Sequence, residues 1–264
     1  DGSGDVTLDQ QRAILHDPNA GPDQTAFLAA AELIKLTATI TDKDGDDASA
    51  TINIGQSLAF EDDAPEIDGR TPASDSLQVD ETSLAVNDST DFSGSFARDY
   101  GADGAGTTVY GLNVSAAGAN SGLDDTATGQ DILLYNEGGV IVGRVGGPTG
   151  DVSFTVSVNP ATGVVTLDQQ RAIVHSPNTG SNQETSLASA NLIQLSATIT
   201  DKDGDTSSAT LNLGNAISFR DDAPTAANQT QSGQATVNIS SNLLIVLDVS
   251  GSMADGSGVG SMDR

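Results

Sequence analysis

The segment LSATITDKDGD at Leu195–Asp205 joins a run of alternating polarity to an acidic loop that contains one glycine. Alternation with a period of two is typical of a β-strand that buries one face. Asp and Gly are favoured turn formers, so the loop is expected to connect this strand to another strand that follows it. The segment therefore predicts a β-hairpin with an acidic tip.

The same pattern occurs earlier in the chain, as LTATITDKDGD at Leu36–Asp46. Two further pairs of segments share this offset of 159 residues: Val6–Asn19 (VTLDQQRAILHDPN) with Val165–Asn178 (VTLDQQRAIVHSPN), and Phe60–Pro65 (FEDDAP) with Phe219–Pro224 (FRDDAP). Self-similarity at a fixed period indicates a tandem-repeat protein in which each repeat is a structural unit.

The offset divides the chain into four parts. Residues 66–224 form one complete repeat, and residues 1–65 are the C-terminal part of the preceding repeat. This first copy lacks the early strands of its unit, so we expect it to expose sheet edges. Residues 225–242, rich in Thr, Ala, Asn, Gln and Ser, are expected to be a linker, and a new module begins at residues 243–264.

Short alternating segments separated by turn signals predict an all-β fold for the repeat. Abundant Gly and an aromatic content of 3% favour tandem β-sandwich repeats of immunoglobulin-like type. The turn Asn159–Gly163 is expected to close a hairpin, and only Thr185–Leu192 is compatible with a helical turn. The expected strands are Thr107–Val114, Asp131–Tyr135, Val140–Val145, Val152–Val158, Val164–Leu167, Leu192–Thr200 and Ser208–Leu213.

Composition restricts the partners. The 37 acidic and 10 basic residues give a formal net charge of −27, which repels nucleic acid and anionic membrane surfaces and favours cations. The absence of Cys excludes disulfides and thiol chemistry, so bound metal is the expected substitute for covalent cross-links. No apolar run approaches the roughly 18 residues of a membrane span, and we expect no membrane insertion.

The two acidic loops are the first candidate metal sites. Each places three carboxylates within five residues: Asp42, Asp44 and Asp46 in the first copy, and Asp201, Asp203 and Asp205 in the second. Two like charges about 4 Å apart repel by roughly 4 kcal/mol at an effective dielectric constant near 20. A bound Ca²⁺ converts this repulsion into attraction, and the alternative is a plain polar turn.

The closing motif of each repeat supplies a second group of candidates, Asp62 with Asp63 and Asp221 with Asp222. These carboxylates could hold a cation shared with the next repeat, and the alternative is the charged start of a linker. Asp80 and Glu81, early in the complete repeat, are expected to add carboxylates to the junction behind it.

The Gly-rich loop that carries Asp99 and Asp103 is a further candidate, with a solvated surface loop as its alternative. His16 and His175 occupy equivalent positions, but no second His, Cys or fixed acidic partner accompanies either in the sequence. We therefore expect both histidines to be ordinary strand or loop residues.

The repeats resemble the tandem repeats of giant RTX adhesins that Gram-negative bacteria export by type I secretion. The segments VTLDQQRAIVH, TATITDKDGD and FxDDAP carry this resemblance over nearly the whole chain. It implies extracellular extender domains, rigidified by Ca²⁺, that support cell adhesion and biofilm formation at the cell surface. The export route follows from the resemblance alone.

The last module opens with the apolar run Leu243–Leu247 followed by Asp248, Ser250 and Ser252. This arrangement resembles the metal-ion-dependent adhesion site (MIDAS) of von Willebrand factor type A domains, an α/β fold whose first strand ends in such a motif. The resemblance implies Mg²⁺ or Ca²⁺ at these three residues, but only in the complete domain, because later loops supply the remaining ligands.

These patterns together predict a structural extender segment of a secreted bacterial adhesin. We expect a monomer whose partners are neighbouring repeats, with a host-cell or surface ligand bound through other domains. The alternative is that the repeats themselves bind glycan or protein, which the absence of Trp and the scarcity of Tyr disfavour. No nucleophile is linked to a nearby base in the sequence, so we do not expect an enzyme.

Overall fold

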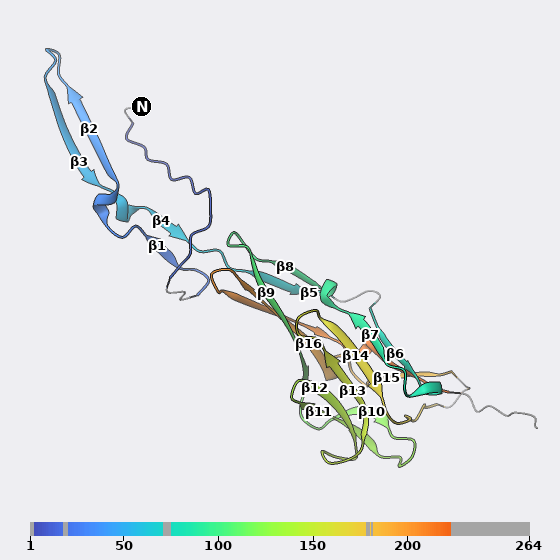
Figure 1. The fold of residues 1–264 in the computed structure, drawn as a ribbon. Helices are drawn as coiled ribbons and strands as arrows, with labels where there is room; N and C mark the ends of the chain where they lie inside the picture. The colour runs from blue at the N-terminus through green and yellow to red at the C-terminus, as the bar shows by residue number, and fades with distance from the viewer. Residues whose placement is uncertain (1–2, 18–20, 71–74, 178–179, 181, 223–264) are drawn as a thin grey trace, which may run out of the picture. The chain divides into compact units, whose positions relative to one another are not determined.

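The computed structural model describes residues 3–17, 21–70, 75–177, 180 and 182–222 (Figure 1). The chain forms two units, Asp1–Pro224 and Thr225–Arg264. The expected linker and type A motif, with Asp248, Ser250 and Ser252, lie outside the described residues. In the described part of the chain no helix is long and apolar enough to cross a membrane.

The largest sheet of the complete repeat has six antiparallel strands in the order β10-β11-β12-β13-β14-β7. Gly163 ends the β13–β14 turn with φ +77°, a backbone conformation that glycine adopts readily, and its N–H donates to the carbonyl oxygen of Asn159 at 2.9 Å. The strands are β7 (Asp88–Asp91), β10 (Ala119–Asp124), β11 (Asp131–Glu137), β12 (Val140–Val145), β13 (Val152–Val158) and β14 (Val164–Gln169).

A second sheet places β16 (Ile193–Asp201) between β9 (Ala105–Val114) and β17 (Thr206–Asn212), as Figure 1 shows for β9 and β16. Every second residue of β16 is buried, from Ile193 through to Asp201. This burial follows directly from the alternating sequence, because successive side chains of a strand point to opposite faces.

The remaining strands are short. Strand β5 (Glu66–Gly69) pairs with β8 (Phe96–Asp99), and β18 (Ile217–Arg220) lies between β15 (Glu184–Ser186) and β6 (Leu77–Asp80). The pairing of β18 with β6 is parallel, whereas the other pairings are antiparallel. Three-residue 3₁₀ turns occur at η3 (Glu81–Ser83), η4 (Ser93–Ser95), η5 (Ala190–Leu192) and η6 (Gly214–Ala216).

One hydrophobic core draws side chains from these sheets. Phe92, Phe154 and Phe219 are fully buried, and the rings of Phe154 and Phe219 pack with centroids 5.0 Å apart at a tilt of 55°. Ile199 and Leu195 of β16 join the same core. Phe96 and Tyr110 are also buried, so most aromatic side chains of the complete repeat lie where buried area stabilises it.

The all-β prediction is confirmed. Each of the seven expected strands is present, with ends within two residues of the expected positions. The short strands β5, β6, β7, β8, β10, β15 and β18 are not anticipated. The helical turn at Thr185–Leu192 is confined to η5, and the expectation that no other segment is compatible with one is wrong, because η3, η4 and η6 are further 3₁₀ turns.

The first copy repeats the C-terminal elements of the complete repeat at the same offset. It contains β1 (Thr25–Phe27), η1 (Ala31–Leu33), β2 (Lys35–Thr41), β3 (Asp47–Asn53), η2 (Gly55–Ser57) and β4 (Ala59–Glu61), which match β15, η5, β16, β17, η6 and β18.

The environment of the two copies differs. Strand β2 pairs with β3 in a two-stranded sheet, whereas β16 also pairs with β9. Ile40 of β2 is 72% exposed, and the equivalent Ile199 of β16 is 0% exposed. The local sequences are nearly identical, so the local pattern does not determine this burial. It is determined by the strands of the complete repeat that have no counterpart in the first copy.

We predict that Ile199→Ala destabilises the complete repeat by about 2–5 kcal/mol, the usual loss for truncating a buried aliphatic side chain. The matched variant Ile40→Ala should change the free energy of unfolding by less than about 0.5 kcal/mol, because its side chain is already in water. Chemical denaturation measures both, and equal effects would contradict the assigned difference in packing.

Candidate metal site at the repeat junction

The acidic loop of the complete repeat is first of all a well-formed turn. One carboxylate oxygen of Asp201 (Oδ1) accepts hydrogen bonds from the backbone N–H groups of Gly204 at 2.9 Å and Asp205 at 2.8 Å. Gly204 has φ +110°, and Asp42 makes equivalent bonds in the first copy at 3.1 and 2.9 Å. These residues therefore form the expected turn, but the turn uses only one carboxylate oxygen of Asp201, or of Asp42 in the first copy.

The pairing of β9 with β16 brings a second loop beside this one. Asp201 lies opposite Ala105 at a bulge, so Asp103 is held next to the acidic loop. A Cβ on Gly106 would lie 2.3 Å from the carbonyl oxygen of Asp201, and only glycine fits this close approach. One carboxylate oxygen from each of Asp103, Asp201 and Asp203 can be chosen so that all three lie within 4.8 Å of one another.

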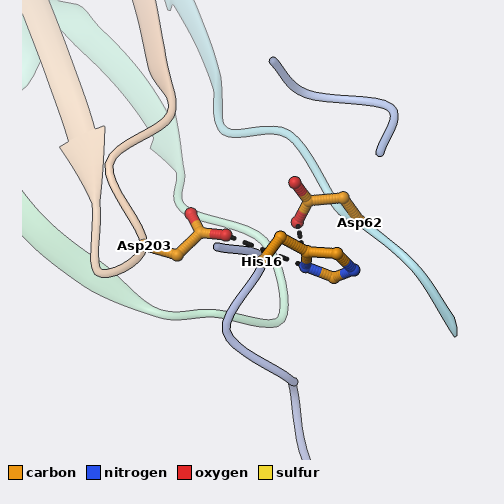
Figure 2. Close-up of side chains that lie close together, drawn as sticks. All are labelled: His16, Asp62 and Asp203. Atoms are coloured by element: carbon orange, nitrogen blue, oxygen red, sulfur yellow. Dashed lines mark ion pairs between the residues drawn. The ribbon is translucent and has the colours of Figure 1, made fainter. Parts of the chain in front are cut away.

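The first copy contributes the remaining side chains. Nδ1 of His16 lies 3.2 Å from Oδ1 of Asp62 and 3.9 Å from Oδ2 of Asp203, as Figure 2 shows. These side chains are 4%, 0% and 2% exposed, respectively. The closing motif of one repeat and the acidic loop of the next thus meet in one buried group. We name it the junction cluster: His16, Asp62, Asp103, Asp201 and Asp203.

The neighbouring acidic residues hold the loops in place. Oδ2 of Asp63 accepts the backbone N–H of Ala102 at 2.7 Å, which ties the closing motif to the loop that carries Asp103. Asp99 is exposed and accepts the backbone N–H of Gly101 at 3.0 Å. Asp63 and Asp99 therefore hold the loop that carries Asp103 in place beside the junction cluster.

Two carboxyl groups of the junction cluster, Asp103 and Asp203, have a raised pKa. Burial raises the pKa of Asp203 to about 6, and a hydrogen bond with Asp201 and the charges of Asp201, Asp62 and Asp103 add to the shift. Burial, followed by the charges of Asp62 and Asp201, raises the pKa of Asp103 as well. Four acidic groups share this region with a single imidazole, so negative charge is in excess.

Two buried carboxylate oxygens of the junction cluster, Oδ2 of Asp62 and Oδ2 of Asp201, have no hydrogen-bond partner. A buried acceptor without a donor destabilises a fold by roughly 1–3 kcal/mol, and more when it is charged. A bound cation would satisfy both oxygens and offset the mutual repulsion.

A second cluster lies at the closing end of the complete repeat and contains Glu81, His175 and Asp221. Nδ1 of His175 is 3.7 Å from Oδ1 of Asp221. Oε1 of Glu81 accepts the backbone N–H of Ile173 at 2.7 Å and the side-chain N–H of Gln169 at 2.8 Å. Burial raises the pKa of Glu81.

The position of Asp80 and Glu81 in the structure differs from the position predicted from the sequence. The sequence assigned Asp80 and Glu81 to the junction behind the repeat, but parallel pairing of β6 with β18 places them at the opposite end, beside Arg220 and Asp221. Asp80 accepts the backbone N–H of Thr82 at 2.9 Å, and Asp222 is exposed.

The expectation that neither histidine has an acidic partner is wrong. His16 and His175 are 5% and 8% exposed, and each lies beside the Asp of its own closing motif. The one feature of the sequence that indicated a role for these histidines was their equivalent position in the two copies. The partners were missed because they come from distant parts of the chain. The acidic loop of the first copy, with Asp42, Asp44 and Asp46, is by contrast exposed.

The repeated segment VTLDQQR also has a structural role that its sequence did not reveal. Arg171 donates to both carboxylate oxygens of the buried Asp125, at 2.7 and 3.0 Å. Gln169 of the same segment donates to Glu81. The Arg171 guanidinium lowers the pKa of Asp125. The segment therefore joins separate parts of the repeat through paired polar groups.

The described architecture is that of an all-β protein with an internal repeat. Residues 1–55 and 76–214 match a family described as Domain of unknown function (DUF5801), and the chain belongs to this family. The two matched stretches end at equivalent positions of the repeat, at the offset of 159 residues. No curated protein and no solved structure matches the chain.

We predict a distinctive pH dependence for the cation-free protein. The pKa of Asp203 is about 6 in the folded state and about 3.8 when unfolded, so the folded state binds this proton more tightly. Its stabilising contribution is complete below pH 4 and is lost as the pH rises through 6. Asp203→Asn should reduce this loss in denaturation curves measured in EDTA, whereas the exposed equivalent, Asp44→Asn, should leave it unchanged. Identical profiles for all three proteins would contradict the burial of Asp203.

Proposed function

We propose that this chain is a structural extender segment of a secreted bacterial cell-surface adhesin, in which Ca²⁺ at the repeat junction makes the array stiff. The observation that carries the proposal is the meeting of Asp62, from the closing motif of one repeat, with Asp203, from the acidic loop of the next. A cation held by both would fix one repeat against the other.

The oxygen-only part of the junction cluster supports Ca²⁺ as the cation. Asp103, Asp201 and Asp203 offer carboxylate oxygens close enough to share one ion. Ca²⁺ takes six to eight oxygen ligands at about 2.3–2.6 Å, including backbone carbonyl groups and water, and tolerates irregular geometry. The loop between β8 and β9 and the loop between β16 and β17 can therefore supply part of its shell without a rigid cage.

The division of ligands between repeats explains how a cation would set stiffness. Without it, the junction brings several like charges together, which favours separation of the repeats. With it, the same charges become ligands. The free energy of binding then depends on the repeats staying in contact.

The finer fold assignment belongs to the same proposal. A six-stranded sheet and the β9-β16-β17 sheet contribute to one core, as expected of an immunoglobulin-like sandwich with additional strands. A repeat of this kind has its ends at opposite edges of the sheets, which suits tandem assembly.

Location and partners follow from the resemblance to RTX adhesins. We propose an extracellular position on a Gram-negative bacterium and export by type I secretion. The proposed role is in cell adhesion and biofilm formation, with neighbouring repeats as direct partners. A type A domain that begins near residue 243 would bind Mg²⁺ or Ca²⁺ through Asp248, Ser250 and Ser252 when complete. Ligand binding would reside in such domains, and the repeats would act without catalysis.

We predict that Ca²⁺ raises the melting temperature of the chain and reduces its radius of gyration in small-angle scattering. A cation at 100 times its Kd adds about 2.7 kcal/mol of stability, enough to shift the midpoint by several degrees. Asp62→Asn should abolish most of the calcium-dependent compaction, because it removes the ligand from the first copy.

The matched control is Asp221→Asn, which alters the equivalent Asp at the far end of the complete repeat. It should retain the calcium-dependent compaction at the first junction. Indistinguishable scattering in Ca²⁺ and EDTA, or equal loss in both variants, would exclude a calcium clamp at this junction.

A further inference from the structure

The two histidines of the chain are held in the same way. Nε2 of His16 lies 3.4 Å from the carbonyl oxygen of Phe60, and Nε2 of His175 lies 3.2 Å from that of Phe219. A carbonyl oxygen can only accept a hydrogen bond, so Nε2 carries the hydrogen in both rings. The other ring nitrogen, Nδ1, therefore has a free lone pair whenever the imidazole is neutral.

That lone pair of His16 points at negative oxygen atoms. Nδ1 is 3.2 Å from Oδ1 of Asp62 and 3.9 Å from Oδ2 of Asp203, and it has no hydrogen-bond partner (Figure 2). A neutral ring would bring its lone pair against those of two carboxylates in a site that excludes water. The arrangement is stable only if a positive charge, either a second ring proton or a metal ion, lies between them.

Asp62 supplies a second and independent indication of a ligand. Its side chain is 0% exposed, and its Oδ2 atom is buried without a hydrogen-bond partner. A proton on His16 would satisfy Oδ1 of Asp62 and leave Oδ2 unsatisfied. A metal ion can be bound by either or both of these oxygens.

We propose that His16, Asp62 and Asp203 form a site for a transition-metal cation of the Zn²⁺ class, separate from the oxygen-only group at Asp103 and Asp201. Neutral imidazole is a preferred ligand of Zn²⁺ and its neighbours in the first transition series, whereas Ca²⁺ selects oxygen. Asp203 belongs to both groups, and Asp62 has a second buried oxygen, Oδ2, without a hydrogen-bond partner. Both carboxylates would therefore bridge the two ions.

The geometry fits such an ion. Ligand atoms around tetrahedral Zn²⁺, with bonds of about 2.0–2.2 Å, lie roughly 3.3–3.6 Å apart. The two distances from Nδ1 of His16, 3.2 and 3.9 Å, fall on either side of this range. Metal-binding histidines usually donate their other N–H to a carbonyl or carboxylate group, which fixes the ring, and Phe60 provides that acceptor.

The site does not depend on calcium binding. It nevertheless joins the same two repeats, since His16 and Asp62 come from the first copy and Asp203 from the complete repeat. The junction would then respond to two chemically different cations, one hard and one of borderline softness.

Titration of the metal-free 264-residue chain with Zn²⁺, and with Co²⁺ as an absorbing substitute, tests the proposal. We expect one tight equivalent, with visible Co²⁺ absorption typical of mixed nitrogen and oxygen ligands. His16→Asn should weaken that equivalent more than roughly 100-fold, since even indirect partners of a metal ligand contribute 10–100-fold. The variant Asp44→Asn, at the exposed equivalent of Asp203, should change its affinity less than about threefold.

Calcium titrations separate this proposal from the proposed function. His16→Asn should leave the Ca²⁺-dependent rise in melting temperature intact, whereas Asp103→Asn should reduce it and keep the tight Zn²⁺ equivalent. Nitrogen-15 spectra of the wild-type chain give a readout that needs no variant, because bound Zn²⁺ should shift the resonance of Nδ1 of His16. A His16 ring protonated at both nitrogens and insensitive to Zn²⁺ would overturn the proposal and leave only a buried ion pair.

Discussion

The pairing of β9 with β16 is the contact on which the rest of the repeat depends. It covers the alternating face of β16, so that Leu195 and Ile199 enter the core. Its register also places the start of β9 opposite Asp201, which brings Asp103 to the acidic loop. Core packing and site assembly therefore share one strand pairing, and a register shift would disturb both.

Each repeat has two chemically different ends. The opening end presents carboxylates on two loops, at Asp103 between β8 and β9 and at Asp201 to Asp205 between β16 and β17. The closing end presents an imidazole beside a carboxylate, as in the pair of His175 and Asp221. Head-to-tail contact places that imidazole among the acidic loops, whereas two opening ends would place acidic loops against one another without it.

The sequence predicts the long strands well because their burial is one-sided and their alternation is regular. It misses β5 to β8, which are short and rich in Asp and gain order from pairing with distant strands. The acidic loops were recognised from local spacing, but no local pattern shows that Asp203 is buried while Asp44 is exposed. The roles of His16 and Glu81 were also beyond reach, since both depend on partners far along the chain.

The near identity of the hairpins β2–β3 and β16–β17 has a consequence for synthesis on the ribosome. Leu36–Asp46 and Leu195–Asp205 differ at one position, so either hairpin has the sequence that β9 requires. When β9 emerges, β2–β3 is already made and β16 is not, so the wrong hairpin is the first one within reach. A β9 strand that paired with the earlier hairpin would exchange strands between the two copies.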